Sequence, residues 1–384
     1  MVPSSRILFV DDEPRVLEGL KDLLRRHRKV WDMHFALGGA EAIQRLDAEP
    51  FDVIVTDAKM PQVDGAEVFR HARERRPEAV RIVLSGEASD NFAFRLSPDA
   101  HQSIAKPCRV GELELVLTRA CALRGILDDP ALRATLGEIR QLPALPQTYT
   151  RLIALLDDER AGMLDVCHVV ETDLALSAKL LQLVNSAFFG AGRQVKSLLQ
   201  AIQLLGLELV KSLALSTGVF TASGLGPERL AFFDALQSHS MDVAFIACGL
   251  ATIEERRTLF TTAVLHDIGL LVELQHLPHL LQRRGRARGE ITWTPDEDRL
   301  HPAIGAYLLG LWGLPLDVIE CVANHHRPLT HGATAFSKIL RRAEEALHLA
   351  QDELDGADAS EIREHALRIA PELDLSAVYV ESGA

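Results

Sequence analysis

Five polar side chains that could handle a phosphoryl group directly follow short apolar segments in the first third of the chain. Asp11 and Asp12 follow RILFV, Asp57 follows FDVIVT, Ser85 follows VRIVL and Lys106 follows HQSIA. A carboxylate can act as a nucleophile and carry a covalent phosphoryl group. Clustered carboxylates repel one another unless a cation joins them, and Mg²⁺ prefers such oxygen ligands. The residue types therefore predict phosphoryl transfer to a carboxylate, with a lysine and a serine contacting the phosphate.

The apolar segments before these residues have the length and composition of buried strands. They cover residues 6–10, 33–37, 51–56, 80–84 and 101–105, and segments of helical period follow at 14–27, 39–48, 65–75, 87–95 and 109–123. This alternation predicts βα units around a parallel sheet. Ligands of such sheets bind beyond the carboxyl ends of the strands, so we expect the five polar residues to converge at one edge.

The motifs around these residues resemble those of CheY-like receiver domains, over residues 5–123. The resemblance is carried by VDDE at 10–13, TDAKMPQVDG at 56–65, LSG at 84–86 and KPC at 106–108. It implies a flavodoxin-like (βα)5 fold and phosphorylation of Asp57 by a sensor histidine kinase. It also implies a Mg²⁺ ion held by Asp11, Asp12, Asp57 and the backbone carbonyl of Lys59, with Ser85 and Lys106 contacting the phosphate.

Two further positions follow from this resemblance. Asp64 and Gly65 are expected to form the turn into the third helix. Receivers often carry Tyr or Phe five residues before the lysine, where this chain has His101. An imidazole could still swing inward when Ser85 moves, and we expect His101 to take part in the switch. The face that changes is expected to contact the linker, the helical domain or a second receiver, which would make a homodimer.

The rest of the chain reads as successive helices, without a convincing strand between residues 130 and 350. We expect a receiver domain at 1–124, a linker at 125–136 that could itself be helical, an all-α HD-like domain at 137–350 and an acidic extension at 351–384. The expected helices cover 131–140, 147–157, 163–170, 174–185, 196–206, 208–223, 227–252, 256–274, 276–284, 296–312, 315–325 and 333–350.

A second chemical group lies in this helical part. His266 and Asp267, within AVLHDIGLL, are expected in the middle of an apolar helix, where a buried charge needs a partner or a metal. Neighbouring helical residues diverge by about 100°, but both can reach one ion beside the helix. Imidazole and carboxylate are good ligands for Mn, Fe or Zn. His27, His71, His276, His279 and His348 lack such a pattern and are expected at the surface.

Residues 137–350 resemble an HDOD domain. The resemblance is carried by LPALPQ at 142–147, ETDLALSAKLLQLVNSAFFG at 171–190, AIQLLGLE at 201–208, HDIG at 266–269 and GLWGLP…HHRP at 310–328. HDOD domains are relatives of HD and HD-GYP phosphohydrolases that generally lack the complete metal site and signal through protein contacts. This chain nevertheless keeps much of the HD-GYP ligand pattern, at His239, His266, Asp267, His301, His325 and His326, with Glu344 in place of the last Asp.

Three interpretations of these residues remain open. They are core polar groups bonded to one another, a metal site without turnover, or a working phosphohydrolase. The G-Y-P motif is missing, since RPLTHG follows His326. We therefore expect a response regulator that signals to downstream proteins rather than an enzyme. The alternative is a receiver-gated, metal-dependent phosphohydrolase or cyclic-dinucleotide phosphodiesterase.

Charge and composition narrow the function classes. The 384 residues carry a net charge of −13, nearly all of it after residue 125, and nucleic-acid binding needs clustered positive charge. The helical part is therefore a poor DNA-binding candidate. No apolar run reaches the roughly 18 residues of a membrane span, and no leader is evident. The five cysteines show no C-x-x-C spacing. We expect a cytoplasmic protein.

Overall fold

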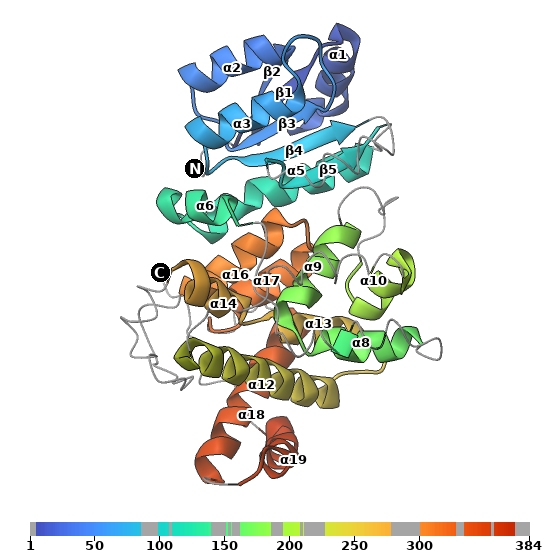
Figure 1. Cartoon of the computed structure of the whole chain (residues 1–384), viewed down its shortest axis with the longest axis vertical. Helices are drawn as coiled ribbons and strands as arrows, with labels where there is room; N and C mark the ends of the chain where they lie inside the picture. Colours follow the sequence, from blue (N-terminus) through green and yellow to red (C-terminus); the bar gives the residue numbers. More distant parts are fainter. Residues whose placement is uncertain are drawn as a thin grey trace. The chain divides into compact units, whose positions relative to one another are not determined.

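A computed structural model of the chain describes residues 5–85, 99–106, 110–139, 151–152, 155, 162–185, 195–207, 210, 227–277, 300–327, 334–354 and 357–372 (Figure 1). Two compact units can be distinguished. The first contains residues 1–140 with 182–194 and 307–314, and the second contains residues 141–181, 195–306 and 315–384.

A parallel sheet of five strands forms the centre of the first unit. Its strands are β1 (Ser5–Asp11), β2 (Trp31–Leu37), β3 (Val53–Asp57), β4 (Val80–Ser85) and β5 (Gln102–Ala105). They lie in the order β2-β1-β3-β4-β5, and every neighbouring pair is parallel. The α/β prediction is therefore confirmed. The register pairs Asp57 with Leu84 and Asp11 with Leu37, which brings the strand ends to one edge of the sheet.

Helices cover both faces of this sheet. Those in contact with its strands are α1 (Pro14–Leu23), α2 (Gly39–Ala48), α3 (Gly65–Arg75) and α5 (Val110–Ile126), and the unit also contains the 3₁₀ turn η1 (Arg25–His27) and α6 (Pro130–Gly137). Alternate strand residues, among them Leu8 and Ile54, share a buried cluster with Ala42 of α2 and Phe69 of α3. The predicted helix at 87–95 lies outside the described residues. The predicted linker is largely α6, which belongs to the first unit.

The remaining described elements are helical, as the sequence predicts. They are α8 (Met163–Glu171), α9 (Leu174–Asn185), α10 (Leu198–Leu205), α12 (Pro227–Leu250), α13 (Arg256–Leu265), α14 (Ile268–His276), α16 (Leu300–Leu311), α17 (Leu316–Asn324), α18 (Ala335–Glu353), α19 (Ala359–Ile369) and the 3₁₀ turn η3 (Ala370–Glu372). The helices predicted at 147–157, 208–223 and 276–284 lie wholly or mostly outside the described residues.

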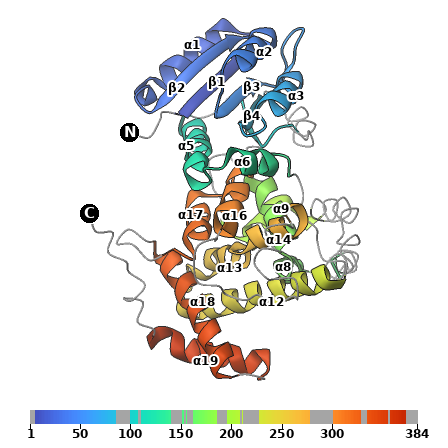
Figure 2. The same ribbon diagram turned by 90° about the vertical axis from the view of Figure 1, so that its left-hand side faces the viewer.

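Two details differ from the predicted helices. The single helix expected over 256–274 is broken into α13 and α14, with His266 and Asp267 between them. The acidic stretch from 351 includes α19, which contacts both α12 and α18 within the second unit (Figures 1 and 2). Part of this stretch is therefore integral to the helical fold.

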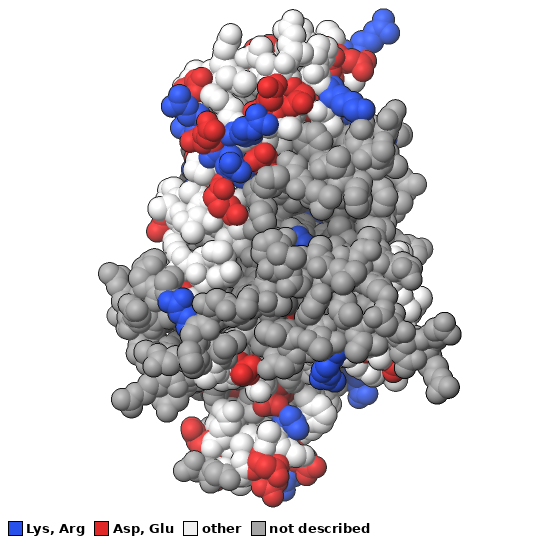
Figure 3. Space-filling model, viewed as in Figure 1, with Lys and Arg blue, Asp and Glu red and all other residues white. Residues whose placement is uncertain are grey.

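The surface of the first unit carries charges of both signs. Figure 3 shows acidic and basic side chains interspersed on one face of it. Across the helices that the structure describes, none combines the length and the apolar composition that crossing a membrane requires.

Candidate functional sites

The first site lies at the carboxyl edge of the sheet and contains Asp11, Asp57 and Lys106, which we call the aspartate site. Lys106 follows β5, and its Nζ donates to Asp11 Oδ2 at 2.8 Å and to Asp57 Oδ1. The Asp11 side chain is only 2% exposed, whereas that of Asp57 is 13% exposed. An incoming reactant can therefore reach Asp57 more easily than Asp11, which suits Asp57 to the role of nucleophile.

Local backbone structure holds the Asp57 carboxylate in place. The backbone N–H of Lys59 donates to Asp57 Oδ2 at 3.0 Å, and the Asp57 carbonyl lies where a Cβ on Gly65 would come within 2.2 Å. Only glycine permits this close approach at the start of α3. Asp64 caps that helix, since its Oδ1 accepts from Glu67 N at 2.9 Å. The predicted turn at Asp64 and Gly65 is confirmed.

Opposing influences act on the charge of Lys106. Burial, the largest of them, lowers the pKa of the ammonium group, but hydrogen bonds and charge attraction from Asp11 and Asp57 raise that pKa above its ordinary value of 10.5. The ammonium group is therefore held charged between two carboxylates. Such a site favours the binding of an anion next to Asp57 once a second cation shares the carboxylate charge.

Two other expected residues are only partly defined. Asp12 directly follows β1 at the same sheet edge and is half-buried. The backbone of Ser85 ends β4, but its side chain lies outside the described part of the structure. The structure thus brings together Asp11, Asp57 and Lys106, and leaves the Ser85 contact as a prediction.

His101 lies away from the aspartate site, buried beneath the linker helix α6. Its Nδ1 accepts from the backbone N–H of Arg81 at 2.9 Å, so its proton is on Nε2, which donates to the Gly137 carbonyl at 3.0 Å. The fully buried Arg81 also donates to the carbonyls of Gly137 and Asp99, at 3.1 and 2.6 Å. Both ring nitrogens are therefore engaged, and the ring connects the β4–β5 edge with α6.

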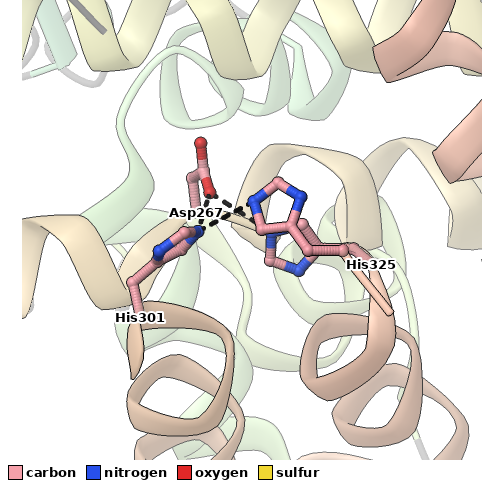
Figure 4. Close-up of side chains that lie close together, drawn as sticks. Asp267, His301 and His325 are labelled. Carbon is pink, nitrogen blue, oxygen red and sulfur yellow. Dashed lines mark hydrogen bonds and ion pairs between the residues drawn. The ribbon is translucent and has the colours of Figure 1, made fainter. Parts of the chain in front are cut away.

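The second site is a buried group of five histidines, one aspartate and one glutamate, and all of them were predicted from the sequence. We call it the histidine cluster: His239, His266, Asp267, His301, His325, His326 and Glu344. Asp267 lies at its centre, with His301 Nε2 and His325 Nε2 at 3.2 and 3.4 Å from Oδ1 (Figure 4). His266 Nε2 and His239 Nε2 lie 3.4 and 3.7 Å from Oδ2.

The break between α13 and α14 falls at His266 and Asp267, whose side chains meet in the cluster. On a continuous helix their directions would differ by about 100°. At Gly269, the second residue of α14, a Cβ would lie 1.9 Å from the His301 carbonyl, so α14 begins in close contact with α16. The expected mid-helix position of the pair is wrong, since α13 ends at Leu265 and α14 begins at Ile268.

The ring orientations leave nitrogen lone pairs directed into the cluster. Nδ1 of His266 donates to the Ala263 carbonyl at 2.6 Å, and Nδ1 of His325 donates to the Val322 carbonyl at 2.6 Å. A carbonyl can only accept, so in the neutral ring of His266 Nε2 carries no proton and is available as a ligand. Among the described residues, Nε2 of His239 and of His266 has no hydrogen-bond partner although it is buried.

Charge states in the cluster also suit a cation. Burial, with a smaller effect of His325 and His239, lowers the pKa of His266 to about 3. For Asp267, burial acts to raise the pKa, but the surrounding histidines hold it well below its ordinary value. Imidazole nitrogens, such as that of the neutral His266 ring, and an ionised carboxylate are donors that bind transition metals. Glu344 completes the set, with Oε1 3.7 Å from His266 Nε2 and 3.7 Å from His326 Nδ1.

His348 is a neighbour of this cluster that the sequence analysis missed. It was expected at the surface, but its ring centroid lies 5.8 Å from that of His239, and burial lowers its pKa to about 3. Its position four residues after Glu344 on α18 was a usable signal, because residues with this spacing share one helix face.

Comparison with known families matches both parts of the chain. The model of the response regulator receiver domain matches residues 7–118, and the model of the HDOD domain matches residues 142–328. In the first unit the match includes the aspartate site, and in the second it includes much of the histidine cluster.

Individual relatives match parts of this chain, and the chain spans less than half the length of the two curated relatives described first. The transcriptional regulatory protein TrcR of Mycobacterium tuberculosis is 35% identical over 125 residues, 32% of this chain and 45% of that protein. The response regulator protein PilR of Pseudomonas aeruginosa is 29% identical over 150 residues, 38% of this chain and 33% of that protein. The MmoQ response regulator of Methylococcus capsulatus is 21% identical with a TM-score of 0.44, covering 59% of this chain and 94% of that one.

Proposed function

Because the chain joins a response regulator receiver domain to an HDOD domain, we propose that Asp57 accepts a phosphoryl group from a sensor histidine kinase. The observation that carries this proposal is the contact of one ammonium group, Lys106, with the carboxylates of Asp11 and Asp57. An Asp57 oxygen forms the new P–O bond, the P–N bond of the donor phosphohistidine breaks, and its imidazole nitrogen keeps the electron pair and takes up a proton.

The carboxylate oxygens at this edge fit a Mg²⁺ ion. Asp11 and Asp57 present their oxygens to the same ammonium group, Asp12 follows at the same strand end, and the Lys59 carbonyl would be the backbone ligand. When bound, Mg²⁺ neutralises charge on carboxylate and phosphoryl oxygens. Lys106 would then turn from Asp57 to the transferred phosphoryl group, with Ser85 as a hydrogen-bond donor to it.

We propose that α6 transmits the effect of phosphorylation from the receiver domain to the HDOD domain. His101 and Arg81 bind the Gly137 carbonyl from the β4–β5 edge. A shift of β4 and β5 after phosphorylation would change these hydrogen bonds to α6, which precedes the HDOD domain in the chain. The change would thereby alter that domain's contacts with downstream proteins or with a second copy of the chain.

Phosphotransfer can be tested with acetyl phosphate, Mg²⁺ and intact-mass spectrometry of the full chain. The wild type and an Asp22→Asn variant, altered at an exposed position of α1, should gain one phosphoryl group. Asp57→Asn should gain none. A phosphorylated Asp57→Asn protein would remove Asp57 from the mechanism.

A second proposal concerns the histidine cluster, which we infer binds transition-metal ions such as Mn, Fe or Zn. Buried imidazole nitrogens without hydrogen bonds beside an ionised carboxylate support this. A working phosphohydrolase remains the alternative function of the same residues. A metal analysis of the purified protein tests for the ion, and a phosphodiesterase assay with added Mn²⁺ separates a metal-holding signalling domain from an enzyme.

A further inference from the structure

Among the described residues the histidine cluster offers three overlapping sets of donors, one of them His266, His325 and Glu344, and the other two share Asp267 and are unequally supplied. Four side chains form the first position: Asp267, His301, His325 and His326. Three form the second: His239, His266 and Asp267. A structural zinc ion takes four protein ligands, whereas an ion with three protein ligands leaves its fourth coordination site to water or substrate. Whether the second position is open or closed therefore depends on a further donor.

Helix α18 carries a candidate for that donor. Glu344 and His348 are four residues apart, so their side chains share one face of the helix. The contact of Glu344 Oε1 with His266 Nε2, at 3.7 Å, shows that this face is turned toward the cluster. His348 lies one turn farther along the same face.

The ring of His348 is about as close to the ring of His239 as the ring of His266 is. The His239 and His348 centroids are 5.8 Å apart with their planes inclined by 31°. The His239 and His266 centroids are 5.5 Å apart, and those two rings already place donor atoms within reach of one ion. Two ligands four residues apart on one helix can also bind a common metal centre, as in the H-E-x-x-H pattern.

We propose that His348 is the fourth protein ligand of the ion position formed by His239, His266 and Asp267. The inference rests on the proposed metal site and adds a residue that the HD-GYP ligand pattern omits. With His348 bound, a tetrahedral ion in the second position has only protein ligands. Such a closed site holds helices α12 and α18 and the α13–α14 turn together, and it favours a structural ion over hydrolysis.

The test is a Co²⁺ titration of the full-length protein in excess Mg²⁺, which occupies the carboxylate site of the receiver domain and competes poorly for imidazoles. Bound Co²⁺ is counted by elemental analysis, and its visible spectrum reports the coordination. We expect two ions in the wild type. In His348→Phe, which keeps a ring but has no donor, the affinity of one ion should fall by about 100-fold.

Three variants make the result specific. His348→Asp restores a donor and should recover the second ion. His301→Phe should weaken the other ion instead. His168→Phe changes an exposed histidine of α8 and should leave both ions unaffected.

The failure of this inference differs from the failure of the metal site itself. If the wild type binds Co²⁺ and His348→Phe binds it with the same affinities and spectrum, His348 is not a ligand, but the metal site stands. If the wild type binds no Co²⁺ and His301→Phe changes nothing, the metal site and the role of His348 are both overturned. Melting of the metal-free variants shows whether each one is folded.

Discussion

Replacing Lys106 with Met should destabilise the folded receiver domain, and added Mg²⁺ should restore part of the lost stability. The substitution keeps most of the apolar stem but removes the ammonium group between Asp11 and Asp57, so that the two carboxylates face one another without compensation. A hydrogen bond involving a charged group contributes about 1.5–3 kcal/mol. Lys106 makes two, but its side chain is 27% exposed and water replaces part of the loss. We therefore expect a loss of about 2 kcal/mol.

Hydrogen exchange by mass spectrometry measures this loss separately for the receiver domain. Amides of β1 and β3 exchange through opening of the sheet, and about 2 kcal/mol corresponds to exchange about 30-fold faster. The matched control is Lys21→Met, which removes the exposed pair with Glu18 on α1. That change should cost at most about 0.5 kcal/mol.

The difference between wild type and Lys106→Met should depend on pH and on Mg²⁺. The pKa of Lys106 is raised in the folded chain, so its stabilisation is fully present below the ordinary value of 10.5 and is lost as the pH rises through the folded value. Mg²⁺ should stabilise the variant more than the wild type, because the ammonium group no longer competes for the carboxylates. Equal exchange rates in the two proteins without Mg²⁺ at pH 7 would refute the reasoning.

Four other predictions concern the surroundings of three glycines and the metal site. Gly137→Ala would place a Cβ 2.7 Å from the Pro77 carbonyl, so exchange of α6 amides should become at least 10-fold faster. Gly19→Ala, in open space within α1, should instead stabilise the chain by about 0.5–1 kcal/mol in urea unfolding. Gly269→Ala would push α14 from the His301 carbonyl, and Co²⁺ binding should fall with the melting temperature of the helical unit. Removing bound metal with a chelator should lower that melting temperature and leave receiver exchange unchanged; an unchanged temperature would contradict the metal proposal.

For the receiver domain, the sequence was sufficient to predict the fold and the core of the site. Short apolar strands alternating with helices specify a parallel sheet, and the carboxyl ends of parallel strands meet at one edge. Asp11, Asp57 and Lys106 could therefore be placed together before any contact was known. The burial of His101 against α6 could not, because helical periodicity shows which side of α6 is apolar but not which surface it covers.

In the helical domain, the ligand types were predictable one by one, but their meeting point was not. An apolar sequence on both sides of His266 and Asp267 suits one long helix as well as two short ones, and only the structure shows that there are two, with Gly269 of the second against the His301 carbonyl. Likewise, the spacing of Glu344 and His348 put them on one face of α18 without saying what that face meets. Sequence periodicity determines which residues share a face, whereas the position of one helix against another depends on side-chain packing between distant segments, and only the tertiary structure contains that information.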